Sequence, residues 1–189
     1  MKFLKNRKTA ILITVVTAII ATLIGVYKTS GRDTRDIEAM FYDGVYLKDD
    51  GYTQASIDSH LGNSADAALG LATIMEKRPE LADKAAALLS ARRELIAAES
   101  ISGKSAAYSG LVSCFDELIR AALSAELTDR ESGAAAEYVS TFNGAGKAML
   151  GSGYNKMVME YLDGRSPFIR IISVFIPVRS PDTFDLPPS

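Results

Sequence analysis

The chain has 189 residues, of which 48% are hydrophobic and 23% are charged, and its formal net charge at pH 7 is −2. These values fit one domain plus a membrane segment, and they exclude a disordered tail, a collagen-like fibre and two full domains. One Cys and one His exclude an internal disulfide framework and a His-rich metal site. Residues 1–32 hold six of the 21 bases and none of the 23 acids. The rest of the chain is therefore acidic, which argues against a nucleic-acid partner.

An uncharged stretch of 19 residues, TAILITVVTAIIATLIGVY, occupies positions 9–27. As a helix it would be about 28 Å long, close to the roughly 30 Å hydrocarbon thickness of a bilayer. The stretch predicts a transmembrane helix in contact with the lipid bilayer, preceded by a basic flank at residues 1–8. A cleaved signal peptide is the alternative. It is disfavoured because the run exceeds a usual signal sequence and the following GVYKTSGR lacks an A-x-A cleavage pattern.

The charges that flank the predicted span indicate its orientation. Four bases and no acid precede the span, whereas bases and acids are mixed after it. Because positive residues stay in the cytoplasm, we expect a cytoplasmic N-terminus and an extracytoplasmic body, in a single-pass protein of the plasma or inner membrane. Residues 28–52 would then form a juxtamembrane connection or an extension of the helix.

Residues 53–163 contain four stretches in which apolar residues recur with helical periodicity, at about 53–77, 80–98, 108–123 and 128–163. The third is the clearest, with apolar residues at spacings of three and four. Breakers separate the stretches. Arg78-Pro79 ends the first and would make Pro79 the first residue of the second helix, Ser102-Gly103 marks a turn, and Thr128-Asp129 offers N-cap residues.

The fourth stretch is weakened by glycines between residues 143 and 153, so either a break at Gly144 or a close helix approach is open. None of the stretches alternates as a strand does. The predicted fold is therefore all-α, with an N-terminal single transmembrane helix followed by an elongated antiparallel helical bundle of about four helices at residues 53–163.

Residues 164–189 form an apolar C-terminal segment and tail. Positions 168–178 are apolar apart from Arg170, but they are too few to span a membrane. We expect this segment to pack on the side of the bundle. A surface that lies on the membrane or docks a partner is one alternative, and a lone edge strand is another. Phe168 and Phe175 are its candidate interaction residues.

A group of residues near the end of the fourth stretch carries the remaining site prediction. Tyr154, Val158 and Tyr161 share one helix face at spacings of four and three, for which core packing is the simplest interpretation. Asn155 could bond across helices or fix the C-terminal segment, which would be a structural role. We therefore predict these four residues as structural or interaction residues.

The same region resembles a known family. The run YNKMVMEY at residues 154–161 is similar to the YNxxVxxYN signature of LemA proteins, near their last long helix. Positions 166–175 lie where that family has an SFP…LIAxLFGF segment, PDTF at 181–184 is similar to its PxxYF ending, and SIDSHL at 56–61 resembles its SQIDVQL stretch. Leu162 replaces the second Asn of the signature, so the resemblance is to a divergent member. It implies a membrane-anchored helical bundle of the bacterial cell envelope.

The sequence offers little enzyme chemistry. AESISGKS at 98–105 matches a relaxed phosphate loop, but it follows a helical stretch and not a buried strand. Nothing places His60 near Cys114, which lies beside a core stripe and is expected to be inert packing. Acid pairs such as Asp116-Glu117 fit a solvated helix face better than a metal or hydrolase site. We therefore expect no catalytic residue, no metal and no cofactor.

Two functional hypotheses follow. The favoured one is a non-enzymatic, membrane-anchored helical bundle that binds another membrane or envelope protein, with homo-oligomerisation left open. An anchored spacer differs from it only in lacking a specific partner. The rival is a small-ligand or enzymatic site in a cavity between bundle helices, which would need polar residues converging on the core.

Overall fold

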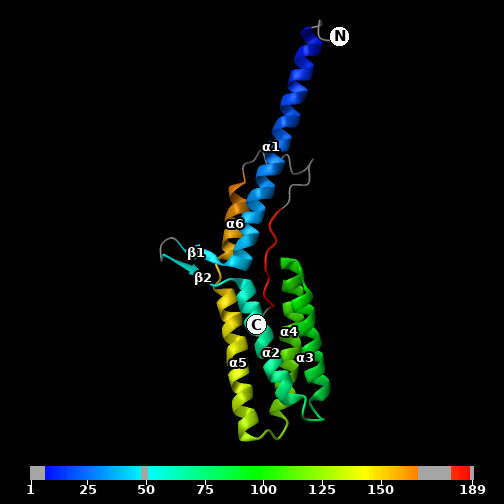
Figure 1. Cartoon of the computed structure of the whole chain (residues 1–189), viewed down its shortest axis with the longest axis vertical. Coiled ribbons are helices and arrows are strands. Elements are labelled where there is room, and N and C mark those ends of the chain that lie inside the picture. Colours follow the sequence, from blue (N-terminus) through cyan, green and yellow to red (C-terminus); the bar gives the residue numbers. More distant parts are fainter. Residues whose placement is uncertain (1–6, 48–50, 166–179, 188–189) are drawn as a thin grey trace. The chain divides into compact units, whose positions relative to one another are not determined.

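The structure is a computed structural model that describes residues 7–47, 51–165 and 180–187 (Figure 1). Most of these residues are helical, so the predicted all-α class is confirmed. The helices are α1 (Arg7–Asp43), α2 (Ile57–Met75), α3 (Ala82–Ala97), α4 (Ile101–Leu123), α5 (Asp129–Leu150) and α6 (Tyr154–Gly164), with two short strands, β1 (Val45–Leu47) and β2 (Tyr52–Gln54). Contacts divide the chain into a first unit, residues 1–38 and 158–181, and a second unit, residues 39–157 and 182–189.

Helix α1 begins inside the basic flank and continues for 37 residues, well past the predicted span. In the described part of the chain it is the one helix long and apolar enough to cross a membrane. Its apolar side chains lie open to the surroundings, with Ile19, Ile20 and Ile24 between 51% and 54% exposed. The described residues thus leave these side chains uncovered, unlike those of the helices that form the core of the second unit.

The strand pair β1–β2 was not predicted from the sequence. It is antiparallel, with Val45 opposite Gln54 and Leu47 opposite Tyr52. Gly44 has φ +91°, and a Cβ at that position would overlap the carbonyl oxygen of Gln54. Helix α1 therefore ends where a glycine permits a left-handed turn into the hairpin, and each strand is too short to show a period of two.

Local capping explains where the helices of the second unit begin. The Ser56 hydroxyl accepts from the backbone N–H of Ser59 at 3.1 Å, and the Ser100 hydroxyl accepts from that of Gly103 at 3.0 Å. Thr128 and Glu131 form a capping box at the start of α5, which confirms the N-cap prediction there.

The predicted break at Arg78-Pro79 does separate α2 from α3. The first-residue role of Pro79, the turn at Ser102-Gly103 and the alternative of a break at Gly144 were wrong. Pro79 lies in the turn before α3, whose N-cap is Leu81, so it is not the first helical residue. Residues 102–103 lie in the first turn of α4, because the Ser100 cap starts that helix earlier. The fourth stretch breaks at residues 151–153 and not at Gly144. Gly144 and Gly146 stay helical on either side of the buried Ala145, and α5 ends at Leu150 with Gly151 as its C-cap.

The core of the second unit lies between α2, α3, α4 and α5. Helix α2 packs against α5 and α3, and α3 packs against α4, as Figure 1 shows. Phe115 and Phe142 stack with ring centroids 3.9 Å apart, which joins α4 to α5. At Gly70 the backbone of α2 lies so close to the Tyr138 ring of α5 that a Cβ would overlap the ring. The predicted stripe of α4 is buried at Tyr108, Leu111, Phe115 and Leu118.

Candidate functional site

The structure places four of the six predicted site residues on α6. Tyr154 and Asn155 belong to the second unit, and Val158 and Tyr161 belong to the first. Tyr154 and Val158 are fully buried, whereas Asn155 and Tyr161 are half-buried. Phe168 and Phe175 lie outside the described residues, as does the apolar segment 168–178. Their predicted interaction role stays a prediction.

Asn155 holds the backbone of the C-terminal segment with both ends of its amide. Its Nδ2 donates to the carbonyl oxygen of Phe184 at 2.7 Å, and the N–H of Phe184 donates to its Oδ1 at 3.0 Å. A primary amide can do this because it carries a donor and an acceptor side by side, as a neighbouring strand would. Asn155 thus satisfies both backbone groups of one residue.

Two further hydroxyl groups of the second unit hold the residues on either side. The Tyr154 hydroxyl donates to the carbonyl oxygen of Asp182 at 2.7 Å. The Ser105 hydroxyl on α4 donates to the carbonyl oxygen of Asp185 at 2.6 Å and accepts from its N–H at 3.2 Å. We call residues 182–185 the C-terminal strap. Helices α4 and α6 therefore bind the strap through its backbone.

An aromatic cluster anchors the strap. Phe184 is 1% exposed, and its ring centroid lies 5.5 Å from that of Phe41 and 6.2 Å from that of Tyr108. Phe41 also meets Tyr154 edge-on, with centroids 5.5 Å apart. Burial raises the pKa of the Tyr108 hydroxyl. One aromatic side chain thus fixes a segment whose backbone is already hydrogen-bonded.

Sequence reasoning missed Phe41, Ser105 and Phe184 as members of this cluster. They come from three segments that are distant in sequence, so no local period links them. One signal was available: Phe184 is an isolated aromatic residue in a tail of Asp, Pro and Ser, where an apolar side chain has no reason to be unless it is buried.

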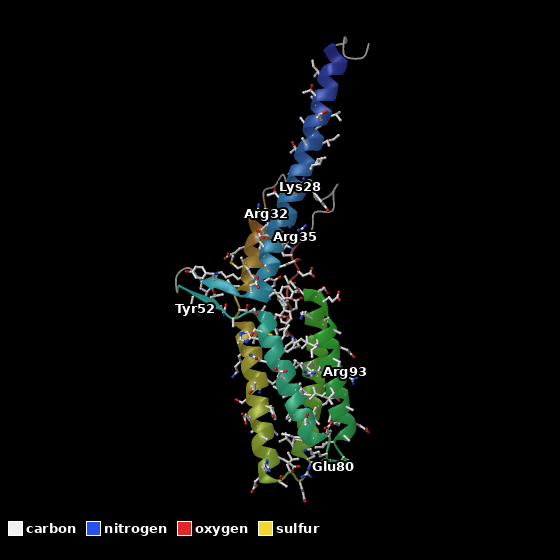
Figure 2. All side chains as sticks on the ribbon, in the orientation of Figure 1. Lys28, Arg32, Arg35, Tyr52, Glu80 and Arg93 are labelled. Carbon is white, nitrogen blue, oxygen red and sulfur yellow. The ribbon has the colours of Figure 1, made fainter. Side chains whose placement is uncertain are left out.

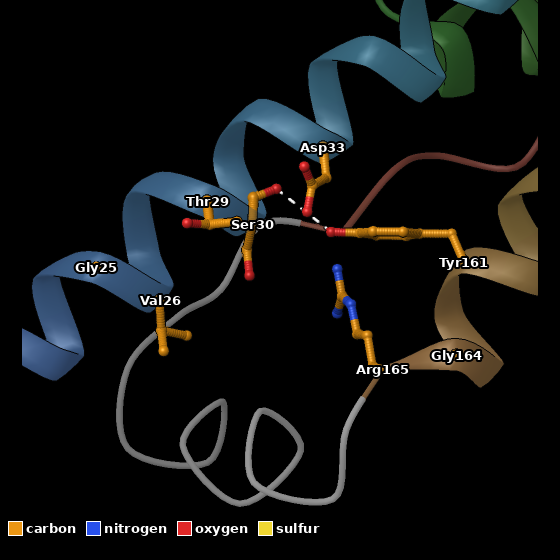
Figure 3. Close-up of a pocket in the computed structure, with 8 residues that line it drawn as sticks. All are labelled: Gly25, Val26, Thr29, Ser30, Asp33, Tyr161, Gly164 and Arg165. Atoms are coloured by element: carbon orange, nitrogen blue, oxygen red, sulfur yellow. Dashed lines mark hydrogen bonds between the residues drawn. The ribbon is translucent and has the colours of Figure 1, made fainter.

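The first unit contains a cleft between α1 and the end of α6, with a volume of about 580 Å³ (Figure 3). Its lining residues are Gly25, Val26, Thr29, Ser30, Asp33, Tyr161, Gly164 and Arg165. The Tyr161 hydroxyl donates to the carbonyl oxygen of Ser30 at 3.4 Å. The guanidinium of Arg165 lies 4.9 Å from the centre of the Tyr161 ring, and its Nη1 donates to the Ser180 hydroxyl at 3.0 Å. The cleft therefore combines small apolar residues with one cation and one carboxylate.

The other residues that could carry chemistry make ordinary structural contacts. Burial, with the nearby Glu117 and Glu94 as smaller causes, raises the pKa of the Cys114 thiol and so lowers its reactivity. In the phosphate-loop-like stretch, Lys104 forms an ion pair with Asp58 at 2.8 Å. Within the described ranges, three or more His, Cys, Asp or Glu side chains nowhere gather as metal ligands would.

Comparisons with known proteins add no family to this picture. Neither protein-family models, nor curated proteins, nor solved structures match this chain, so the resemblance to LemA proteins stays a prediction from the sequence.

Proposed function

We propose that this chain is a membrane-anchored helical bundle of LemA type, which binds another membrane or envelope protein and is not an enzyme. Residues 9–27 of α1 would cross the bilayer, and α2–α5 would form an antiparallel bundle outside the cytoplasm. The observation that carries the proposal is the exposure of the apolar side chains on α1.

The exposed apolar surface of α1 would be unfavourable in water. Ile11, Val15, Val16, Ile19, Ile20, Ile24 and Tyr27 are between 45% and 58% exposed. Full burial of one such aliphatic side chain contributes roughly 1.5–3 kcal/mol, so leaving this surface in water would be strongly unfavourable. A bilayer supplies the missing apolar environment all around the helix.

The helix continues beyond the apolar stretch into residues that pack in the body, but these contacts do not decide between an uncleaved anchor and a signal peptide. Ser30 accepts the Tyr161 hydrogen bond in the first unit, and Phe41 packs in the aromatic cluster of the second. Cleavage after residue 27 would leave these contacts intact, so only the fate of the N-terminus in cells decides between the two.

The β1–β2 hairpin is the surface that we assign to a protein partner. Tyr46 and Tyr52 are 60% and 53% exposed. Because aromatic side chains are enriched at protein interfaces, two exposed tyrosines on one hairpin favour a protein partner. Tyr52 is labelled in Figure 2. The hairpin is tied to the second unit, because the Gln54 side chain donates to the carbonyl oxygen of Gly151 at 3.0 Å and accepts from the N–H of Gly153 at 3.1 Å.

Topology in intact cells tests the anchor and its orientation. Ser140 is exposed on α5, so a Ser140→Cys variant on a Cys114→Ser background would carry one accessible thiol. We expect a membrane-impermeant maleimide to label it without lysis, while Asn6→Cys on the same background is labelled only after lysis. The reverse result would contradict the orientation. Full-length protein that alkaline carbonate extracts from membranes would contradict the anchor itself.

Photo-crosslinking tests the partner surface. A photoreactive amino acid at position 46 is expected to form a protein adduct in intact cells, whereas the same group at Leu123, which is 82% exposed on α4, is not. An adduct of twice the mass of the chain would make a second copy the partner. Equal adducts at both positions, or none at position 46, would contradict the assignment to the hairpin.

A further inference from the structure

We infer that the cleft of the first unit binds the headgroup of a zwitterionic phospholipid that carries a primary ammonium, of the phosphatidylethanolamine type. The inference rests on the proposed anchor, because it requires residues 9–27 to lie in a bilayer. It also rests on Arg165 and Asp33, the two charged residues that line the cleft in the described part of the chain.

The position of the cleft along α1 matches the headgroup layer. Gly25 and Val26 are the last turn of the predicted span, and they line one end of the cleft. With a rise of about 1.5 Å per residue, Ser30 lies roughly 4.5 Å beyond Tyr27 and Asp33 roughly 9 Å beyond it. The headgroup layer of one leaflet is about 5–7 Å thick. The cleft therefore begins at the acyl chains and ends where the headgroups meet water.

The shape of the cleft leaves room for a lipid. A Cβ added at Gly25 or at Gly164 would meet no atom within 4 Å, so two of the lining positions have open space beside the backbone. The Tyr161 ring forms one wall and is fixed by its hydrogen bond to Ser30. Gly25 and Val26 lie at the membrane end, where an apolar lining suits the glycerol and first methylenes of a phospholipid.

The charges select the headgroup. A guanidinium is the side chain that best recognises a phosphate, because it donates two parallel hydrogen bonds. Figure 3 shows the Arg165 guanidinium and the Asp33 carboxylate on opposite sides of the Tyr161 hydroxyl. A phosphate at Arg165 and an ammonium at Asp33 would match this pair. A phosphatidylglycerol headgroup would place uncharged hydroxyls at Asp33 and so leave the carboxylate without a cation, and the quaternary ammonium of phosphatidylcholine has no N–H to donate to it.

Lys28 and Arg32 supply the competing explanation. Both are exposed on α1 beside the cleft, and Figure 2 labels them. Exposed bases near a membrane surface attract any anionic lipid without a pocket. That attraction predicts a preference for phosphatidylglycerol, whereas the cleft predicts a preference for phosphatidylethanolamine.

Lipid binding to the purified full-length protein tests the inference. Native mass spectrometry would compare retention of dioleoyl phosphatidylethanolamine, phosphatidylcholine and phosphatidylglycerol. We expect the ethanolamine lipid to bind about tenfold more tightly than the choline lipid, because a hydrogen bond to a charged group typically contributes this much. Asp33→Asn should remove that difference and strengthen the binding of phosphatidylglycerol. Arg165→Gln should weaken the binding of all three lipids. Arg93→Gln and Asp83→Asn, exposed on α3, are the matched controls.

Three outcomes would overturn the inference: equal binding of the three lipids, a preference for phosphatidylglycerol in the unmodified protein, or an ethanolamine preference that Asp33→Asn leaves unchanged. If circular dichroism shows that Arg165→Gln loses helix, Asp33→Asn alone decides. Flotation with phosphatidylcholine vesicles separates this test from the anchor. Variants that float but show no headgroup preference would refute the cleft and leave the proposed function intact, whereas protein that does not float would refute the proposed function.

Discussion

Helices α1 and α4 both carry many apolar side chains, but these side chains have opposite surroundings. Leu111, Phe115 and Leu118 of α4 are at most 2% exposed, whereas Ile19 and Ile20 of α1 are more than half exposed. Helix α4 exposes Asp116, Glu117 and Arg120 on the side opposite its buried apolar residues, so the rest of the body can cover the apolar side. The apolar stretch of α1 has no charged face at all. The arrangement of apolar residues, more than their number, therefore decides whether the rest of the body covers a helix.

The largest effect should come from removing a side chain that α4 buries. Phe115→Ala deletes a ring that stacks on Phe142 and is 2% exposed. The loss of buried apolar surface, together with the cavity that is left behind, should lower the free energy of unfolding by about 3–5 kcal/mol. Urea unfolding of the full-length protein followed by circular dichroism measures it. Leu123→Ala on the same helix removes an exposed side chain and should change the stability little.

The corresponding change in α1 should leave the body folded and weaken only the anchor. Ile20→Arg places a charge near the centre of the predicted span, which disfavours membrane insertion by roughly 3 kcal/mol. We expect a smaller fraction of the protein to resist alkaline carbonate, with an unchanged urea midpoint for the body. Tyr46→Arg on the exposed hairpin is the control for added charge. A drop in the urea midpoint would mean that protein, not lipid, covers this part of α1.

The C-terminal strap should depend on Asn155. Asn155→Ala removes both hydrogen bonds to the Phe184 backbone and leaves one donor and one acceptor to find new partners. We expect the free energy of unfolding to fall by about 2 kcal/mol. Asn143→Ala, an exposed asparagine on α5, is the matched control. Equal midpoints for the two variants would show that the aromatic contacts of Phe184 alone hold the strap.

How far the sequence predicts this molecule follows from the same contrast. The helices of the body were predictable because a period near 3.6 is a local property of the sequence. Thr128 likewise predicted the start of α5, because an N-cap residue acts on its own helix. The β1–β2 hairpin was not, because two strands of three residues depend on Gly44 and on the side chain of Gln54 reaching residues 151 and 153. The site prediction rested on one helix face for Tyr154, Val158 and Tyr161, and on the apolar C-terminal segment for Phe168 and Phe175. Its partners Phe41, Ser105 and Phe184 are brought together only by tertiary packing, which no local spacing encodes.

Two glycines with opposite surroundings test the difference between a packed and an open helix face. Gly70→Ala would drive a methyl group into the Tyr138 ring, whereas a Cβ at Gly110 on α4 would meet no atom within 4 Å. Alanine is favoured over glycine in a helix by about 1 kcal/mol, so Gly110→Ala should stabilise the protein by up to that amount. Overpacking at Gly70 should outweigh the same gain and give a net loss of about 1 kcal/mol. Thermal midpoints of the same sign for both variants would contradict the close approach of α2 and α5.

The smallest effect concerns a surface pair that joins the turn after α2 to the start of α5. Glu131 accepts from Arg78 at 2.7 Å and 3.2 Å, and the Thr128 N–H also donates to it at 2.9 Å. Arg78 first, and then Thr128, lower the pKa of the Glu131 carboxyl to about 2, from an ordinary value of 4.5. Because the folded state prefers the carboxylate, its contribution to stability is complete above pH 4.5 and disappears as the pH falls towards 2.

We therefore expect Glu131→Gln to lower the thermal midpoint slightly at pH 7, and the difference from the unmodified protein to vanish near pH 2. The effect should be small because ion pairs near the surface contribute little and are screened by salt. Glu137→Gln, exposed on the same helix, controls for the loss of one negative charge. A difference between Glu131→Gln and the unmodified protein that stayed constant from pH 7 to pH 2 would place the contribution in side-chain packing. The charge of the carboxylate would then have no part in holding α5 to the turn after α2.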